Sequence, residues 1–175
     1  MSARTLSGRA AIAGIGATEF SKESGRSELQ LSVEAVRDAL ADCGLAPSDV
    51  DGLVTFTMDS SSEIAVAREL GIGELRFFSR INFGGGAACA TVQQAAMAVA
   101  TGVADVVVAY RGFNERSGDR FGQVSNWAAA QVNTNGFDNA WTYPLGLSTP
   151  AATVAMQARR LMKRKPGYLK LYILK

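Results

Sequence analysis

Hydrophobic and polar positions alternate along this chain between strand-like and helix-like patterns. Four segments predict β-strands, either as continuous apolar runs or as an apolar–polar alternation: residues 9–16, 50–56, 76–83 and 105–110. Apolar side chains at helical spacing predict helices at residues 28–43, 62–70 and 148–163, and one of about five turns ending near residue 101. This order predicts an α/β fold, with a mixed, mostly parallel sheet and helices on both faces.

Two of the predicted strands have distinct environments. Residues 9–16 are predicted to form a buried first strand. The β-branched run at residues 105–110 predicts a central strand covered on both faces. Residues 112–146 then lose all periodicity and are rich in Gly, Asn and aromatic side chains, among them Trp127, Trp141 and Tyr143. A loop this long in a compact domain is usually functional. We therefore expect a long loop insertion that faces the substrate or acts as a lid.

Composition limits the function classes. The chain of 175 residues is 47% apolar, enough for one sizeable core, and it contains no apolar run long enough to cross a membrane and no signal-peptide pattern. Its two cysteines, Cys43 and Cys89, are far apart, which favours a reducing cytoplasm. It has no histidine, which excludes Ser-His-Asp and Cys-His catalysis and His-based metal sites within this chain. We expect a cytoplasmic protein without a metal site.

The charge is unevenly distributed. Residues 159–175 carry seven basic and no acidic side chains, whereas the rest of the chain carries eleven basic and sixteen acidic ones. Basic side chains favour the C-terminal turn of a helix, so we interpret this as a solvated helix end and expect no nucleic-acid partner. We divide the chain into residues 1–162 as the folded part and residues 163–175 as an atypical basic tail.

Three consecutive glycines between a strand and a helix form the candidate site. Glycine lets the backbone approach a ligand closely, and the N–H groups at a helix start can stabilise a developing negative charge. With the preceding asparagine and one loop aromatic, the predicted substrate-binding residues are Asn82, Gly84, Gly85, Gly86 and Tyr143. A tight packing turn remains the alternative explanation for the glycines. Catalytic residues are not assigned, and we expect no cofactor.

Several segments carry a family resemblance. GIGATEF, GRSEL, VDGLVTF and GVADVVVAY, together with the glycine turn and its Ala-rich helix, resemble the N-terminal half of thiolase-superfamily proteins of the lipid-transfer branch. Within that branch the chain is similar to the actinobacterial steroid side-chain-cleaving aldolases of cholesterol degradation. The resemblance implies a thiolase-like half with a complete length about twice that of this chain. It also implies that activity needs the missing C-terminal half, where the family's catalytic tyrosines fall.

The resemblance also has consequences for the chemistry. It places Gly85 where thiolases carry their acyl-accepting cysteine, which opposes thiolase chemistry and fits a carbon–carbon lyase. The implied reaction is retro-aldol cleavage of a β-hydroxyacyl-CoA steroid, with coenzyme A as part of the substrate. Cys89 is predicted to be a small buried side chain, and Tyr110 a core residue at a strand end. The alternatives are a thiolase or lipid-transfer acyltransferase, and a non-catalytic acyl-CoA-binding subunit.

Two partners follow from the same resemblance. We expect a homodimer through the segments from Arg76 to Asn82 and from Ala87 to Thr101, where an edge strand and a small-residue helix lie together. We also expect a hetero-complex with an OB-fold, acyl-CoA-associated partner protein.

Overall fold

The computed structural model describes residues 6–56, 61–81, 88–114, 143–147 and 150–165. They belong to two compact units, residues 1–117 and 118–175. The first unit contains, in order, α1 (Glu28–Cys43), the short 3-10 helix η1 (Pro47–Asp49), β1 (Gly52–Phe56), α2 (Glu63–Leu70), β2 (Phe77–Ile81), α3 (Ala90–Thr101) and β3 (Val107–Ala109). The second contains η3 (Tyr143–Leu145) and α6 (Pro150–Arg164).

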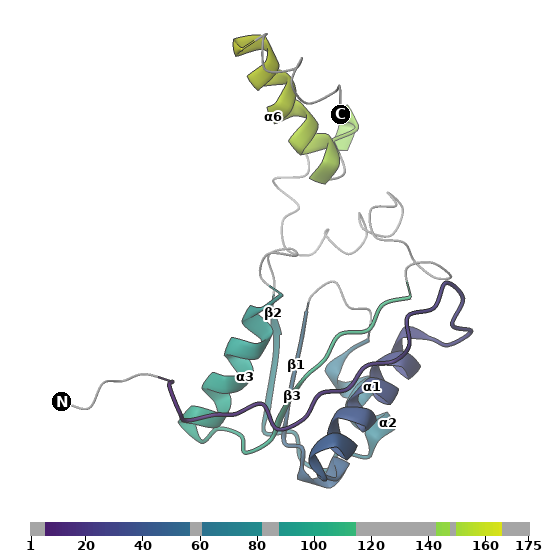
Figure 1. Ribbon diagram of the computed structural model, residues 1–175, viewed down its shortest axis with the longest axis vertical. Coiled ribbons are helices and arrows are strands. Elements are labelled where there is room, and N and C mark those ends of the chain that lie inside the picture. Colours follow the sequence, from purple (N-terminus) through teal and green to yellow (C-terminus); the bar gives the residue numbers. More distant parts are fainter. Residues whose placement is uncertain (1–5, 57–60, 82–87, 115–142, 148–149, 166–175) are drawn as a thin grey trace, which may run out of the picture. The chain divides into compact units, whose positions relative to one another are not determined.

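The three described strands form a parallel sheet in the order β2-β1-β3. Figure 1 shows α3 on one side of this sheet and the α1–α2 pair on the other. The connection from β1 to β2 runs through α2, and that from β2 to β3 runs through α3. The predicted α/β architecture, with a parallel sheet and helices on both faces, is therefore confirmed.

Local capping signals fix the first two helices. The hydroxyl of Ser27 accepts a hydrogen bond from the N–H of Gln30 at 3.1 Å, and Gly44 ends α1 in the left-handed conformation at φ 71°. Ser62 and Gly71 play the same two roles for α2. Both helices therefore lie within a residue or so of where the sequence predicts them.

The main core lies between the sheet and the α1–α2 pair. It is formed by the apolar stripes of the two helices, the middle of β1 and one face of β3, with Val36, Leu53 and Val66 almost fully buried. Burial of a side chain of this size contributes about 1.5–3 kcal/mol to stability. This face of the sheet fixes the position of the strand ends.

Three predictions about single elements are wrong. Residues 9–16 are extended but are not a strand, and Ile12 and Ile15 are 76% and 77% exposed rather than buried. A strand requires a hydrogen-bonded neighbour. Among the described residues, the backbone of this segment forms only a turn at Arg9 and a bond from the Ile15 N–H to the Asp42 carboxylate.

The other two corrections concern β3 and α3. Only Val107–Ala109 is strand, and β3 is an edge of the described sheet rather than a central strand, because β1 is its sole neighbour there. α3 spans twelve residues instead of about five turns, because it begins at Ala90 and ends at Gly102, which has a φ of 73°. The edge position of β3 leaves one side of the strand unpaired.

Candidate functional site

The carboxyl ends of the strands form the candidate site. In a parallel sheet these ends meet at one edge, and ligands bind there when successive connections leave on opposite faces. Here α2 and α3 lie on opposite faces, and β1, β2 and β3 end at Phe56, Ile81 and Ala109. Of the segments that follow these three residues, the structure describes the one after β3, residues 110–114.

Most of the predicted substrate-binding residues lie outside the ranges that the structure describes. β2 ends at Ile81, and the description of the chain resumes at Ala88, just before α3. Tyr143 is the first residue of η3 in the second unit. Four of the five predicted residues lie outside the described ranges: Asn82, Gly84, Gly85 and Gly86. Their role stays a prediction.

Cys89 differs from its prediction. It lies immediately before α3 and is exposed, not a small buried side chain. The reason is that α3 begins at Ala90, so Cys89 occupies the start of the helix instead of a position one turn inside it. An exposed thiol at a helix N-terminus is in the kind of environment where cysteines react.

Arg111 places a cationic group at this edge. Its guanidinium carbon lies 5.3 Å from the ring centroid of Phe56 at the end of β1 and 4.3 Å from that of Phe113. Both distances fall within the range of cation–π attraction. Arg111 itself is exposed, so the two rings hold a positive charge at the carboxyl edge. Sequence reasoning missed this cluster, although an Arg directly after a predicted strand was a usable signal.

Tyr110 anchors the end of β3. The side chain is buried, and its hydroxyl donates to the carbonyl of Ser61 at 3.1 Å. The prediction that Tyr110 is a core residue at a strand end is therefore confirmed. Since this bond joins the exit of β3 to the start of α2, it fixes the backbone on which Arg111 sits.

The segment after β3 is also tied to α1. The Asn114 side chain donates to the carbonyl of Arg26 at 2.9 Å, and its backbone N–H donates to the Glu28 carboxylate at 3.4 Å. Gly112 packs against Ser32 so closely that any side chain there would collide with the Ser32 hydroxyl. The exit from β3 therefore follows one fixed path across the end of α1.

Asp51 occupies the opposite, amino-terminal edge of the sheet. Its carboxylate accepts the N–H groups of Asp105 and Val106 at 2.9–3.0 Å and the Arg76 guanidinium at 3.2 Å. Burial raises the pKa of this carboxyl, but the two N–H groups and Arg76 outweigh it and hold the pKa below its usual range. Asp51 is a structural anchor, far along the strands from the candidate site.

The described residues contain neither a candidate metal site nor a candidate membrane span. They contain no group of three or more His, Cys, Asp or Glu side chains placed to hold a metal ion. None of the helices in the described ranges is long and apolar enough to span a bilayer. The reactive groups that the described residues place at this edge are the exposed thiol of Cys89 and the guanidinium of Arg111, which contacts two aromatic rings.

Comparison with known proteins gives a consistent picture. No family model matches the sequence. The chain is 73% identical over 157 residues to the 17-hydroxy-3-oxo-4-pregnene-20-carboxyl-CoA lyase of Mycobacterium tuberculosis and 68% identical over 157 residues to a steroid side-chain-cleaving aldolase of Thermomonospora curvata. These matches cover 90% of this chain but 41% and 40% of the two relatives. The chain thus spans about two fifths of the length of the curated relatives it matches.

A solved structure of the Ltp2-ChsH2(DUF35) aldolase is also similar. The match covers 91% of the present chain and 39% of the solved chain, with a TM-score of 0.72 and 66% sequence identity. The two chains are therefore similar in both fold and sequence. The resemblance predicted from the sequence motifs is thereby confirmed: over nine tenths of its length, the chain is similar to part of the steroid side-chain-cleaving aldolases.

Proposed function

We propose that this chain is part of a carbon–carbon lyase that cleaves the side chain of a steroid CoA thioester by a retro-aldol reaction. The observation that carries the proposal is the 73% identity over 157 residues to the 17-hydroxy-3-oxo-4-pregnene-20-carboxyl-CoA lyase. Because the match covers 41% of that relative, the complete activity requires the remaining sequence.

The bond changes follow from a 17-hydroxy group placed β to a thioester carbonyl. A base removes the hydroxyl proton, and the oxygen electrons form a C=O bond at C17 as the C17–C20 bond breaks. The electron pair of that bond passes to the thioester enolate, which is protonated at C20. The products are a 17-ketone and a three-carbon acyl-CoA. No step requires a covalent enzyme intermediate, an oxidant or a cofactor.

The glycine turn is the proposed oxyanion site. Backbone N–H groups at Gly84, Gly85 and Gly86 would stabilise the negative charge on the thioester oxygen, and loss of one such donor costs about 3–4 kcal/mol in enzymes where it has been measured. Asn82 and Tyr143 are proposed to contact the substrate. The catalytic base is not assigned to this chain, which has no histidine.

A thiolase or lipid-transfer acyltransferase is the second candidate, and one observation favours it. Cys89 is exposed at the start of α3, so its thiol is accessible to an acyl-CoA. Against it, no histidine in this chain can take the proton from that thiol. A non-catalytic acyl-CoA-binding subunit is the third candidate and predicts binding without turnover.

Two assemblies belong to the proposal. The solved relative carries the names of two components, Ltp2 and ChsH2(DUF35), which supports a hetero-complex with an OB-fold, acyl-CoA-associated partner. A homodimer through β2 and α3 is supported by the edge position of β2 and by Phe78, which is 68% exposed on it. We place the protein in the cytoplasm, the compartment that suits its two free cysteines.

The test uses a full-length lyase that carries this sequence, with its CoA-thioester substrate. We expect Gly85→Val to abolish release of the three-carbon acyl-CoA while the thermal unfolding midpoint stays near the wild-type value. Gly73→Val is the matched control, because a side chain at Gly73 meets no atom within 4 Å. Turnover and unfolding are measured on the same samples.

The other possible results distinguish between the alternatives. A folded and fully active Gly85→Val variant would show that the turn does not face the reaction. A variant that unfolds would support the packing explanation of the glycines. An acyl-transfer burst that disappears in Cys89→Ala would favour the acyltransferase over the lyase.

A further inference from the structure

The start of α2 is fastened to both outer strands of the described sheet. The carbonyl of Ser61, just before the helix, accepts a hydrogen bond from the hydroxyl of Tyr110, the residue after β3, at 3.1 Å. Two residues further along, the Glu63 carboxylate accepts the Nε–H and an Nη2–H of Arg80, on β2, at 3.2 and 3.0 Å. Since α2 follows β1 in the chain, its start lies at the carboxyl edge and links the ends of β2 and β3 there.

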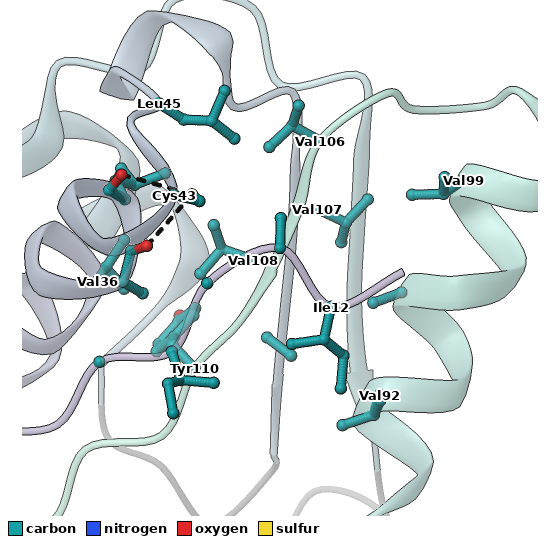
Figure 2. Close-up of a pocket in the computed structure, with 18 of the residues that line it drawn as sticks. Ile12, Val36, Cys43, Leu45, Val92, Val99, Val106, Val107, Val108 and Tyr110 are labelled. Carbon is teal, nitrogen blue, oxygen red and sulfur yellow. Dashed lines mark hydrogen bonds between the residues drawn. The ribbon is translucent and has the colours of Figure 1, made fainter. Parts of the chain in front are cut away.

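The strand register brings these side chains to one helix start. Thr55 of β1 lies opposite Arg80 of β2. Val54 lies opposite Ala109, and continuing this register by one residue places Tyr110 beside Thr55 on its other side. Figure 2 shows Tyr110 on the α1 side of β3, within the core between the sheet and the α1–α2 pair. Arg80 and Tyr110 therefore reach α2 from either side of the buried Thr55.

The pair between Glu63 and Arg80 has a defined geometry. The Glu63 side chain is 12% exposed and that of Arg80 is 38% exposed, so the carboxylate is largely shielded while the guanidinium is partly solvated. Two parallel N–H···O bonds fix the plane of the guanidinium as well as its distance from the carboxylate. Apolar side chains of similar volume often stabilise a buried site as well as an ion pair does. The particular contribution of this pair is therefore a fixed orientation of Arg80.

We propose that Glu63 and Arg80 are positioning residues of the lyase, which set the direction in which the chain leaves β2 toward the proposed oxyanion turn. Arg80 is the penultimate residue of β2, and Asn82, the first residue of the predicted site, is two positions further along. Misplacement of reacting groups by about 1 Å can lower a rate by about a hundredfold, so a small rotation of the strand end affects turnover. The inference rests on the proposed function, because it requires catalysis at that turn.

Amide exchange measures the strand end without any turnover. The Phe77 N–H donates to the Asp51 carbonyl, so by the alternation of a parallel ladder the Ile81 N–H also faces β1, at the other end of β2. In residue-resolved hydrogen–deuterium exchange of the full-length protein, Glu63→Gln should speed exchange of the Ile81 amide at least fivefold and leave the Phe77 amide unchanged. Glu69→Gln, at an exposed carboxylate in the last turn of α2, is the matched control and should change neither.

Steady-state kinetics measures the consequence for catalysis. In the full-length lyase that carries this sequence, Glu63→Gln and Arg80→Gln should each lower kcat by about ten- to a hundredfold while KM changes less than about threefold. Arg80→Lys keeps the charge but cannot form two parallel bonds, so its kcat should stay close to that of Arg80→Gln. The double variant should lose no more than either single variant, because the two residues act as one unit. Glu69→Gln should retain the wild-type kcat.

The outcomes separate this inference from the proposed function. A wild-type protein that releases no three-carbon acyl-CoA refutes the proposed function itself. An active wild type whose kcat is unchanged in Glu63→Gln overturns this inference alone. Full activity of Arg80→Lys, which would show that a positive charge suffices, also overturns it, as do losses that add in the double variant.

Two further results complete the test. A variant that loses turnover while Ile81 exchanges at the wild-type rate overturns the inference, because the effect then does not pass through the strand end. If Glu63→Gln does not fold, as judged by circular dichroism, the Arg80 variants carry the same test, because they leave the residues at the start of α2 unchanged.

Discussion

Replacing Asp51 with Asn should destabilise the first unit by about 2–3 kcal/mol. The Asp51 carboxylate accepts two backbone N–H groups, from Asp105 and Val106, at 2.9–3.0 Å, and it is largely buried. Hydrogen bonds to a charged group contribute about 1.5–3 kcal/mol each in favourable cases, and the Asp105 N–H is exposed enough for water to replace its partner. The Arg76 pair adds little, because the Arg76 side chain is 44% exposed.

The loss should depend on pH in a defined direction. The pKa of Asp51 is lowered in the folded state from its ordinary value of 3.8, because the N–H groups and Arg76 outweigh burial. A carboxyl with a depressed folded pKa stabilises the fold above its unfolded pKa, and this contribution is lost as the pH falls through the folded value. The wild type should therefore exceed Asp51→Asn in stability at pH 7, and the difference should shrink below about pH 4.

Urea unfolding at pH 7 and pH 3 measures both quantities, with Asp38→Asn as the matched control because Asp38 is an exposed carboxylate on α1. At pH 7 the expected loss corresponds to a decrease of roughly 8–12 °C in melting temperature for a unit of this size. Ordinary surface substitutions change the free energy of unfolding by less than about 0.5 kcal/mol. A loss below this size at pH 7 would therefore refute the anchoring role of Asp51. A loss that is the same at both pH values would refute the assignment of the effect to the charge.

Three further predictions follow from single side chains. Cys89→Ala in the full-length enzyme should leave retro-aldol turnover within a few-fold, and a loss of several orders of magnitude with the fold intact would establish covalent catalysis. Phe78→Glu should convert the proposed dimer to a monomer in light scattering, while Ile64→Glu on α2, equally a charge placed at an exposed apolar site, should not. Glu63→Gln should lower the stability by about 1 kcal/mol in urea unfolding, because it weakens the 3.0 Å pair with a partly exposed Arg80; an unchanged midpoint would contradict this.

The sequence predicted those elements whose signals are local. A serine before and a glycine after each of α1 and α2 determine where the helices begin and end, because those residues satisfy the backbone groups of the helix ends themselves. Alternation in residues 76–83 likewise predicted the half-exposed strand β2, whose side chains alternate between half-buried and exposed. Neither inference required knowledge of a distant segment.

Strand pairing and the site could not be predicted in the same way. Whether residues 9–16 form a strand depends on a neighbour elsewhere in the chain, and no local pattern reveals its absence. The exposure of Cys89 was missed because it depends on which residue begins α3, and helix boundaries are poorly specified in an alanine-rich run without a capping side chain. The cluster of Arg111 with two aromatic rings depends on the path after β3, which the contacts with α1 set.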